Sequence, residues 1–163
     1  MIAHINGKLV ELNPAYAVIE CNGVGYYLNI SLNTYSRLGE SESCKLFTHL
    51  SVKEDSHTLY GFYEKLERKI FRMLISVSGV GASTARVILS SMQSSEIRDA
   101  IVSEDIALIK SVKGIGVKTA QRIQFPSSEY SKIYVDLPFY CSTHYNKKQL
   151  KIIYQYMTCH TIV

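Results

Sequence analysis

Hydrophobic and polar positions alternate along the first 62 residues of the chain. Runs rich in β-branched and aromatic side chains are separated by turn dipeptides such as Asn-Gly and Asn-Pro, which is a pattern typical of antiparallel strands. The runs are IAHINGKLVEL, YAVIECNG, VGYYLNISL, CKLFTHLSV and HTLYGFY. Five short strands with such turns predict a small antiparallel barrel or sandwich over residues 1–63, so this whole segment is interpreted as strands.

The hydrophobic period changes to that of a helix after Tyr63. Apolar side chains recur at helical spacing with charges between them,. They are Leu66, Ile70, Phe71 and Leu74. Four further helical patterns follow, STARVILSSM, SSEIRDAIVS, EDIALIKSV and KTAQRIQ, and Asp105 or Ser103 is available to cap the third of them,. Residues 64–123 are therefore predicted to form a compact bundle of about five short helices, which makes the chain an α+β protein.

One phrase occurs twice in the helical segment. LISVSGVGASTARVI (residues 74–88) returns 35 residues later as IKSVKGIGVKTAQRI (residues 109–123), and an internal repeat of this kind marks one supersecondary unit present in two copies. Each copy places an apolar–x–Gly–apolar–Gly turn between two helices. Glycine adopts positive φ cheaply and allows close approach, and the next helix begins with unpaired N–H groups. Each copy is therefore a candidate phosphate-binding hairpin, and the alternative is a tight turn with no ligand.

The formal net charge of +4 is distributed unevenly along the chain. Residues 1–62 carry a net charge of −2, residues 63–123 carry +4, and residues 124–163 carry +2. The repeated phrase thus lies in the most basic segment, which favours a nucleic-acid ligand. Two phosphate-binding hairpins related by a pseudo-twofold axis can hold a duplex backbone without reading its bases.

The segments SGVGASTARVILS and KGIGVKTAQRI resemble paired helix–hairpin–helix motifs. The opening MIAHINGKLVE and the segment SVKEDSHTLYGFYEKLERKIFRMLISVSGVG resemble the RuvA family of Holliday-junction-binding proteins, over about residues 1–123. The resemblance implies an N-terminal OB-fold barrel followed by a double helix–hairpin–helix domain. It also implies a homotetramer, or a pair of tetramers, that holds a four-way DNA junction and acts with the RuvB ATPase and the RuvC resolvase in recombination and repair.

The candidate DNA-binding residues combine the hairpins that the resemblance assigns with the basic side chains around them. They are Gly79, Val80, Gly81, Ser83, Arg86, Lys113, Gly114, Ile115, Gly116, Lys118 and Arg122. Many relatives have lysine at the position of Ser83, so the first hairpin is expected to depend more on backbone N–H groups. Glu54 and Asp55 match the family's acidic pin, whose carboxylates would repel phosphates at the junction centre; without that context, they would be interpreted as a solvated turn.

The chain departs from the family after Ile123. Pro126 would end the last helix early,, and residues 124–163 are expected to be an atypical, poorly structured tail rather than the usual RuvB-binding domain. A reading-frame change in the source gene would produce the same Tyr-rich composition. The tail contains four cysteine and histidine residues that could ligate a metal, but the last two are adjacent in sequence, so neither a metal site nor a cofactor is predicted,. They are Cys141, His144, Cys159 and His160.

Two other functions stay open at this stage. One is a generic DNA-binding scaffold module without junction preference. The other is a DNA glycosylase-lyase, with Lys118 as a Schiff-base lysine and Asp136 downstream, although such enzymes have one hairpin motif rather than two. The chain has no G-x-x-x-x-G-K-[ST] motif, so a non-catalytic subunit is expected and any ATPase activity would come from RuvB,. No apolar run approaches the roughly 18 residues of a membrane span, and no signal peptide is evident, so a cytoplasmic protein is expected.

Overall fold

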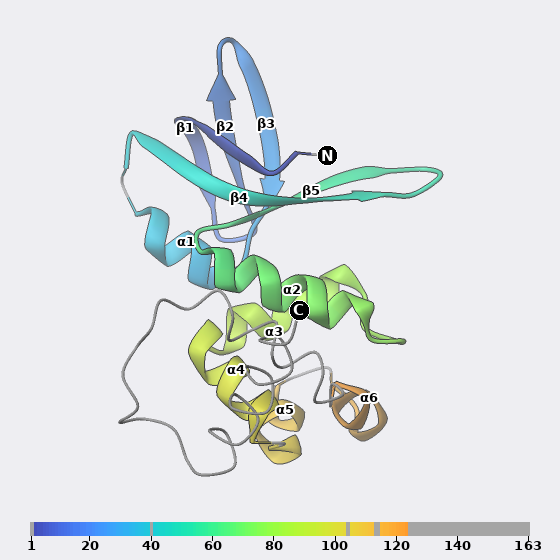
Figure 1. Ribbon diagram of the computed structural model, residues 1–163. Helices are drawn as coiled ribbons and strands as arrows, with labels where there is room; N and C mark the ends of the chain where they lie inside the picture. Colours follow the sequence, from blue (N-terminus) through green and yellow to red (C-terminus); the bar gives the residue numbers. More distant parts are fainter. Residues whose placement is uncertain (1, 40, 104, 113–114, 124–163) are drawn as a thin grey trace, which may run out of the picture.

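The computed structural model of the 163-residue chain describes residues 2–39, 41–103, 105–112 and 115–123. Five strands close a barrel in the order β1-β2-β3-β5-β4, and a group of helices packs against one end of it (Figure 1). The strands are β1 (His4–Asn13), β2 (Tyr16–Cys21), β3 (Val24–Asn29), β4 (Ser43–Val52) and β5 (His57–Phe62). The α+β architecture and the five predicted strands are thus confirmed.

The barrel forms because mainly apolar side chains at alternate strand positions point inward, such as Ala17 and Ile19 of β2 and Cys44 and Leu46 of β4,. β1 pairs in antiparallel fashion with both β2 and β4, and a parallel contact between Asn29 of β3 and Tyr60 of β5 completes the closure. The buried core contains side chains from all five strands and from the segment that follows β3. Its members are Ile5, Ala17, Ile19, Leu28, Ile30, Leu38, Cys44, Leu46 and Leu59.

A short helix interrupts the segment that the sequence pattern assigned entirely to strands. α1 (Leu32–Leu38) follows β3, which ends at Asn29 rather than continuing to residue 32. Ser31 caps the helix by accepting a hydrogen bond from the Thr34 N–H at 3.1 Å. The all-strand interpretation is therefore wrong here, because a seven-residue helix carries too few turns for its period to stand out,.

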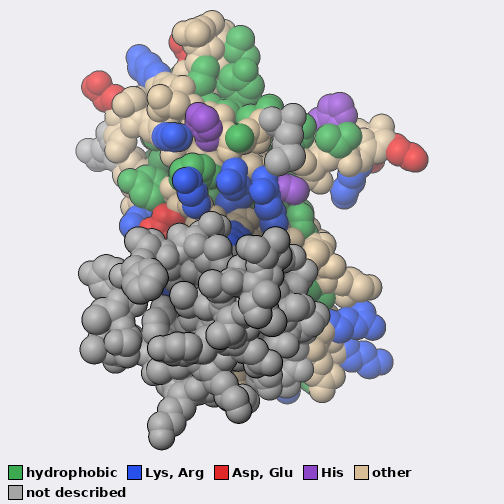
Figure 2. Space-filling view, in the orientation of Figure 1, with side chains coloured by type: hydrophobic (Ala, Val, Ile, Leu, Met, Phe, Trp, Pro, Cys, Tyr) green, Lys and Arg blue, Asp and Glu red, His purple; other side chains and the backbone are tan. Residues whose placement is uncertain are grey.

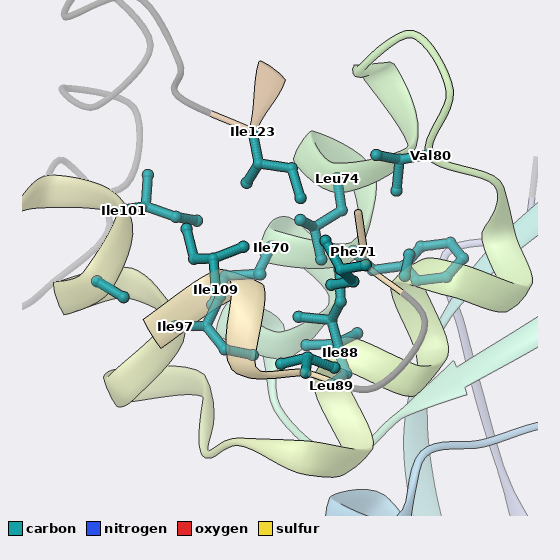
Figure 3. Packing of buried hydrophobic residues seen from close by; sticks show 14 of the residues in the cluster. Ile70, Phe71, Leu74, Val80, Ile88, Leu89, Ile97, Ile101, Ile109 and Ile123 are labelled. Carbon is teal, nitrogen blue, oxygen red and sulfur yellow. The ribbon is translucent and has the colours of Figure 1, made fainter. Parts of the chain in front are cut away.

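Up to residue 123, the described part of the chain contains five helices after the barrel, as the helical period predicts. They are α2 (Lys65–Ser76), α3 (Ala82–Ser91), α4 (Ser94–Val102), α5 (Ile106–Ser111) and α6 (Val117–Arg122). Of the two candidate caps, Asp105 is the one used for α5, since its carboxylate accepts a hydrogen bond from the Leu108 N–H at 3.0 Å. Isoleucine, leucine and valine side chains from these helices and from the turns between them meet in one cluster (Figure 3). None of the described helices is long and apolar enough to cross a membrane.

The helical core also includes side chains from the barrel. Phe71 of α2 is fully buried, with its ring centroid 4.9 Å from that of Phe62 and 5.0 Å from that of Tyr60, both on β5. His49 of β4 lies 5.5 Å from the same ring. These aromatic contacts cross the predicted domain boundary after residue 63. The division into two domains stays a prediction.

A buried carboxylate joins α1 to α2. Glu67 is only 3% exposed and accepts hydrogen bonds from the hydroxyls of Ser31 and Thr34, the latter at 2.7 Å. Burial raises the pKa of the Glu67 carboxyl above its ordinary value, and the two hydroxyl hydrogen bonds oppose that shift,. The polar pairing is therefore what allows a charged residue to lie inside this contact.

Candidate nucleic-acid interface

Where the structure describes both copies of the repeated phrase, their backbone conformations agree. The first hairpin, residues 77–81, joins α2 to α3; the second, residues 112–116, joins α5 to α6. Gly81 has φ −82° and ψ 166°, and Gly116 has φ −77° and ψ 160°. Val77 and Val112, which end the preceding helices, have φ/ψ of −78°/125° and −69°/122°. The repeat in sequence is therefore a repeat in structure.

Hydrogen bonds within the two hairpins also recur at equivalent positions. Each hairpin is closed by a backbone bond across its turn, each following helix begins with a bond back to its glycine, and each preceding helix ends with a serine hydroxyl bonded to its own helix. The pairs are Val80 N–H to Val77 O (3.0 Å) and Ile115 N–H to Val112 O (3.1 Å), Ala85 N–H to Gly81 O and Ala120 N–H to Gly116 O (both 2.9 Å), and Ser76 Oγ to Met73 O (2.7 Å) and Ser111 Oγ to Leu108 O (2.6 Å).

The apolar residue at the centre of each hairpin anchors it to the core. Val80 is 5% exposed and Ile115 is 7% exposed, and Figure 3 shows Val80 turned toward the hydrophobic cluster. Both were among the candidate DNA-binding residues. Because their side chains are buried, only their backbone groups remain available to a ligand.

The glycines of the hairpins have different roles. Gly79 has φ +89°, a conformation that side-chain-bearing residues rarely adopt,. Gly81 and Gly116 have ordinary φ, and nothing lies within 4 Å of the position where a Cβ would stand. The expected positive φ is thus found at Gly79 and is wrong for Gly81 and Gly116, where the missing side chain leaves open space in front of a helix N-terminus. Gly114 lies outside the described residues.

These open helix ends carry donors that no side chain caps. Neither Gly81 at α3 nor Gly116 at α6 provides a side-chain cap, so the first-turn N–H groups face the space above the glycines. Ser83 and Lys118 occupy equivalent exposed positions in these first turns. The arrangement can accept an anion from the direction of the open space.

Two of the candidate arginines point away from their own hairpins. Arg122, at the end of α6, donates from NH1 to the Ser78 carbonyl oxygen at 3.4 Å, so it lies against the first hairpin although it belongs to the second copy. Arg86 donates to the Ala15 carbonyl oxygen at 3.1 Å and to Asn29 Oδ1 at 3.0 Å, both in the barrel. The structure therefore brings Arg122 to the candidate site and does not bring Arg86 there. Lys113 lies outside the described residues.

The two residues of the predicted acidic pin lie at the tip of the β4–β5 hairpin. This hairpin projects beyond the barrel wall (Figure 1), and acidic side chains occupy its far end (Figure 2). Glu54 and Asp55 are both exposed, and a hydrogen bond of 2.9 Å from the Lys53 N–H to the Ser56 carbonyl oxygen closes the turn. Their charges are thus displayed away from the protein body.

Sequence reasoning missed a basic cluster around Phe47. Lys45 of β4, Lys65 and Arg68 of α2 place their charged groups 5.4–5.8 Å from the centre of the Phe47 ring,. Basic side chains gather on this face in Figure 2. Burial, together with the nearby Arg72 and Arg68, lowers the pKa of His49 beside them. The cluster joins segments about twenty residues apart, so no local pattern indicates it.

Across the described parts of the chain, no group of three or more metal-ligating side chains occurs.

Fold and hairpins together define a class: an OB-like five-stranded barrel followed by tandem helix–hairpin–helix motifs. Comparison with known families agrees. Residues 1–61 match the RuvA N-terminal domain, and residues 71–125 match the SAM-like helix-hairpin-helix tandem. The chain is therefore similar to the RuvA N-terminal domain over residues 1–61 and to a helix-hairpin-helix tandem over residues 71–125, and the resemblance noted from its motifs is confirmed.

Three similar proteins bear the name Holliday junction branch migration complex subunit RuvA. The protein from Christiangramia forsetii is 67% identical over 123 residues, 76% of this chain and 64% of the relative. The protein from Flavobacterium psychrophilum is 62% identical over 122 residues, 75% of this chain and 63% of the relative. The protein from Bacteroides thetaiotaomicron is 54% identical over 123 residues, 76% of this chain and 61% of the relative. The chain thus spans less than two thirds of the length of these relatives. The predicted tail, residues 124–163 with its cysteines and histidines, lies outside the described residues.

Proposed function

We propose that this protein binds four-way DNA junctions through their phosphate backbones, without reading base sequence, as a non-catalytic subunit of a branch-migration complex in recombination and repair. The observation that carries the proposal is the pair of matching hairpins, each with an open glycine before an uncapped helix. The names of the relatives, which are branch migration complex subunits, support the choice of a junction as the ligand.

Each hairpin would hold one phosphate group. The first-turn N–H groups of α3 and α6 would donate to the phosphate oxygens, and the missing side chains at Gly81 and Gly116 would let the backbone approach,. Lys118 adds a cation at the second hairpin, and Arg122 adds one at the first, where Ser83 supplies only a hydroxyl. Gly79 and, by equivalence in the repeat, Gly114 would set the turn, while Lys113 stays a candidate from the sequence alone. Such contacts position DNA and carry no sequence information.

Partners follow from the same proposal. We infer a homotetramer, or a pair of tetramers, around one junction, with ATP hydrolysis supplied by RuvB and strand cleavage by RuvC. The inferred contact with RuvB rests on the resemblance of residues 1–123, since Pro126 and the residues after it depart from the family pattern.

The alternative functions have less support. Lys118 is exposed on α6 rather than enclosed by groups that would activate an amine as a Schiff-base nucleophile,, and Asp136 lies outside the described residues. A scaffold module without junction preference would have the same hairpins, so binding data must separate it from the leading proposal.

The proposal is tested by comparing a four-way junction with a linear duplex of the same arm sequence in a fluorescence anisotropy titration. We expect tighter binding to the junction, by at least about tenfold, and a logarithmic salt dependence with a slope of about −0.9 per phosphate contacted. Scrambling the arm sequences should leave both affinities unchanged. Equal affinity for the two substrates would favour the scaffold module, and binding that is insensitive to salt would exclude the phosphate contacts.

Replacing both acidic residues of the hairpin tip, Glu54→Gln with Asp55→Asn, is expected to keep or modestly raise junction affinity. The reason is that the two substitutions remove carboxylates from the vicinity of phosphates. Energy transfer between labelled junction arms should at the same time report a less open arrangement. The matched control is Glu20→Gln with Glu42→Gln, which removes the same charge from exposed positions elsewhere on the barrel. A marked loss of affinity in the folded tip variant, with the control unaffected, would contradict the pin assignment.

A further inference from the structure

α3 links the first hairpin to the barrel. The helix begins at the hairpin glycine Gly81, and one turn later Arg86 reaches the barrel. Its guanidinium donates to the Ala15 carbonyl oxygen at 3.1 Å, in the turn between β1 and β2, and to Asn29 Oδ1 at 3.0 Å, at the end of β3. The Ala15 oxygen also accepts the Ile30 N–H at 3.1 Å. Arg86 thus ties the helix to a point where two barrel segments already meet.

The other end of α3 is held by α1, whose Leu38 belongs to the barrel core. Asn33 of α1 donates from Nδ2 to the carbonyl oxygens of Leu89 and Met92, at 2.6 and 2.7 Å. Carbonyl groups at a helix C-terminus have no partner within the helix, so one amide from the barrel side satisfies two of them. In addition, the Leu32 N–H donates to Ser90 Oγ at 3.1 Å. These bonds join segments 56 to 59 residues apart in the chain.

We propose that Arg86 and Asn33 are positioning residues that clamp α3 to the barrel and thereby set the preference for junctions over duplex DNA. The inference rests on the proposed function. The acidic tip, Glu54 and Asp55, belongs to the barrel, whereas the hairpin at Gly81 belongs to the helical domain. A junction has to accommodate the repelling tip at its centre while its arms occupy the hairpins, whereas a linear duplex needs only the hairpins. A fixed spacing keeps the tip carboxylates clear of the phosphates of the bound arms, so it favours the junction and leaves duplex binding unchanged.

This role differs from the one that the sequence suggests for Arg86, a basic residue of the repeated phrase. A phosphate-contacting arginine would strengthen binding to every DNA substrate and would contribute about one unit to the salt slope. A clamping arginine would do neither. The two roles therefore predict different results in the same experiment.

The experiment compares wild-type protein with Arg86→Met, Asn33→Ala and the double variant. For each, the dissociation constants for junction and duplex are measured over a range of salt concentrations. We expect the double variant to lose about tenfold in junction affinity, as expected for the loss of a few hydrogen bonds. Duplex affinity should stay within about twofold and both salt slopes should stay unchanged, since no phosphate contact is removed. Arg86→Lys, which keeps one donor, should recover part of the junction affinity.

Lys8→Met is the charge-matched control, because Lys8 is an exposed cation of β1 outside the clamp. Weaker binding to both substrates by Arg86→Met, with a salt slope reduced by about one, would overturn the proposal in favour of a phosphate contact. Unchanged junction affinity in the double variant would overturn it as well. If thermal denaturation shows the double variant to be unfolded at the assay temperature, the single Arg86→Met variant decides with the same readouts. Failure of the proposed function would appear separately, as wild-type protein without junction preference.

Discussion

Aspartate in place of both Gly81 and Gly116 is expected to leave the protein folded while lowering junction affinity by about 100-fold or more, equivalent to about 2.7 kcal/mol. The backbone at both positions is extended, with φ −82° and −77°, so any residue can adopt it,. Nothing lies within 4 Å of the added Cβ. The new carboxylate would occupy the open space in front of the first-turn N–H groups, where the phosphate is proposed to bind, and would repel it.

Stability should move in the opposite direction to binding. Aspartate is a favoured N-cap residue, and relative to glycine it is expected to stabilise each helix by a few tenths of a kcal/mol. Urea denaturation should therefore give an unfolding free energy equal to or above that of the wild type. Lost binding in an equally stable variant cannot be attributed to unfolding.

Gly25→Asp is the matched control for this variant. Gly25 is an exposed glycine of β3, and its added Cβ would make only an ordinary contact of 3.5 Å with Val18. The substitution introduces on the barrel one carboxylate, as each of the two hairpin substitutions does at a helix N-terminus, so junction affinity should change little. Retained affinity in the Gly81/Gly116 variant, or an equal loss in the control, would mean that the hairpins do not hold phosphates.

Phe71→Ala is expected to destabilise the protein by about 3–5 kcal/mol, as for other buried phenylalanines. Phe71 is fully buried and touches the rings of Phe62, Tyr60 and His49. Its removal would leave a cavity between β4, β5 and α2, where the barrel meets the helices. Because domains are stable by only about 5–15 kcal/mol, this is a large share of the total.

The same variant tests whether the barrel and the helices unfold together. Urea denaturation followed by far-ultraviolet circular dichroism and by tyrosine fluorescence should give one coincident transition in wild type and variant. Phe71→Leu, which keeps most of the buried volume, should cost clearly less. Two separated transitions, with only the helical one shifted by Phe71→Ala, would show that the two parts do not share a core.

Features that depend on neighbours in the chain could be predicted from the sequence. Alternation at period two indicated five strands, and the change of period after Tyr63 indicated the helices, because side-chain direction in a strand or helix repeats over a few residues. The hairpins were recognisable for the same reason. Their turn closes with bonds such as Val80 N–H to Val77 O, which span three residues.

Short elements supported by distant contacts could not be predicted in this way. α1 has only seven residues, and its environment includes Glu67 of α2, which bonds to Thr34 across 33 residues. A helix of this length has little stability of its own, so its formation depends on such tertiary contacts. The local sequence around residue 32 therefore resembled the end of a strand.

The sequence by itself determined which residues form the two hairpins and that the segment around them is basic. Only the tertiary structure decided where each arginine points: Arg122 turns to the first hairpin, 44 residues away, and Arg86 turns to the barrel. It also decided that Gly79 is needed for its positive φ, whereas Gly81 and Gly116 leave space. A long side chain has several rotamers of similar energy, and the acceptors that select one of them here belong to segments that only folding brings near.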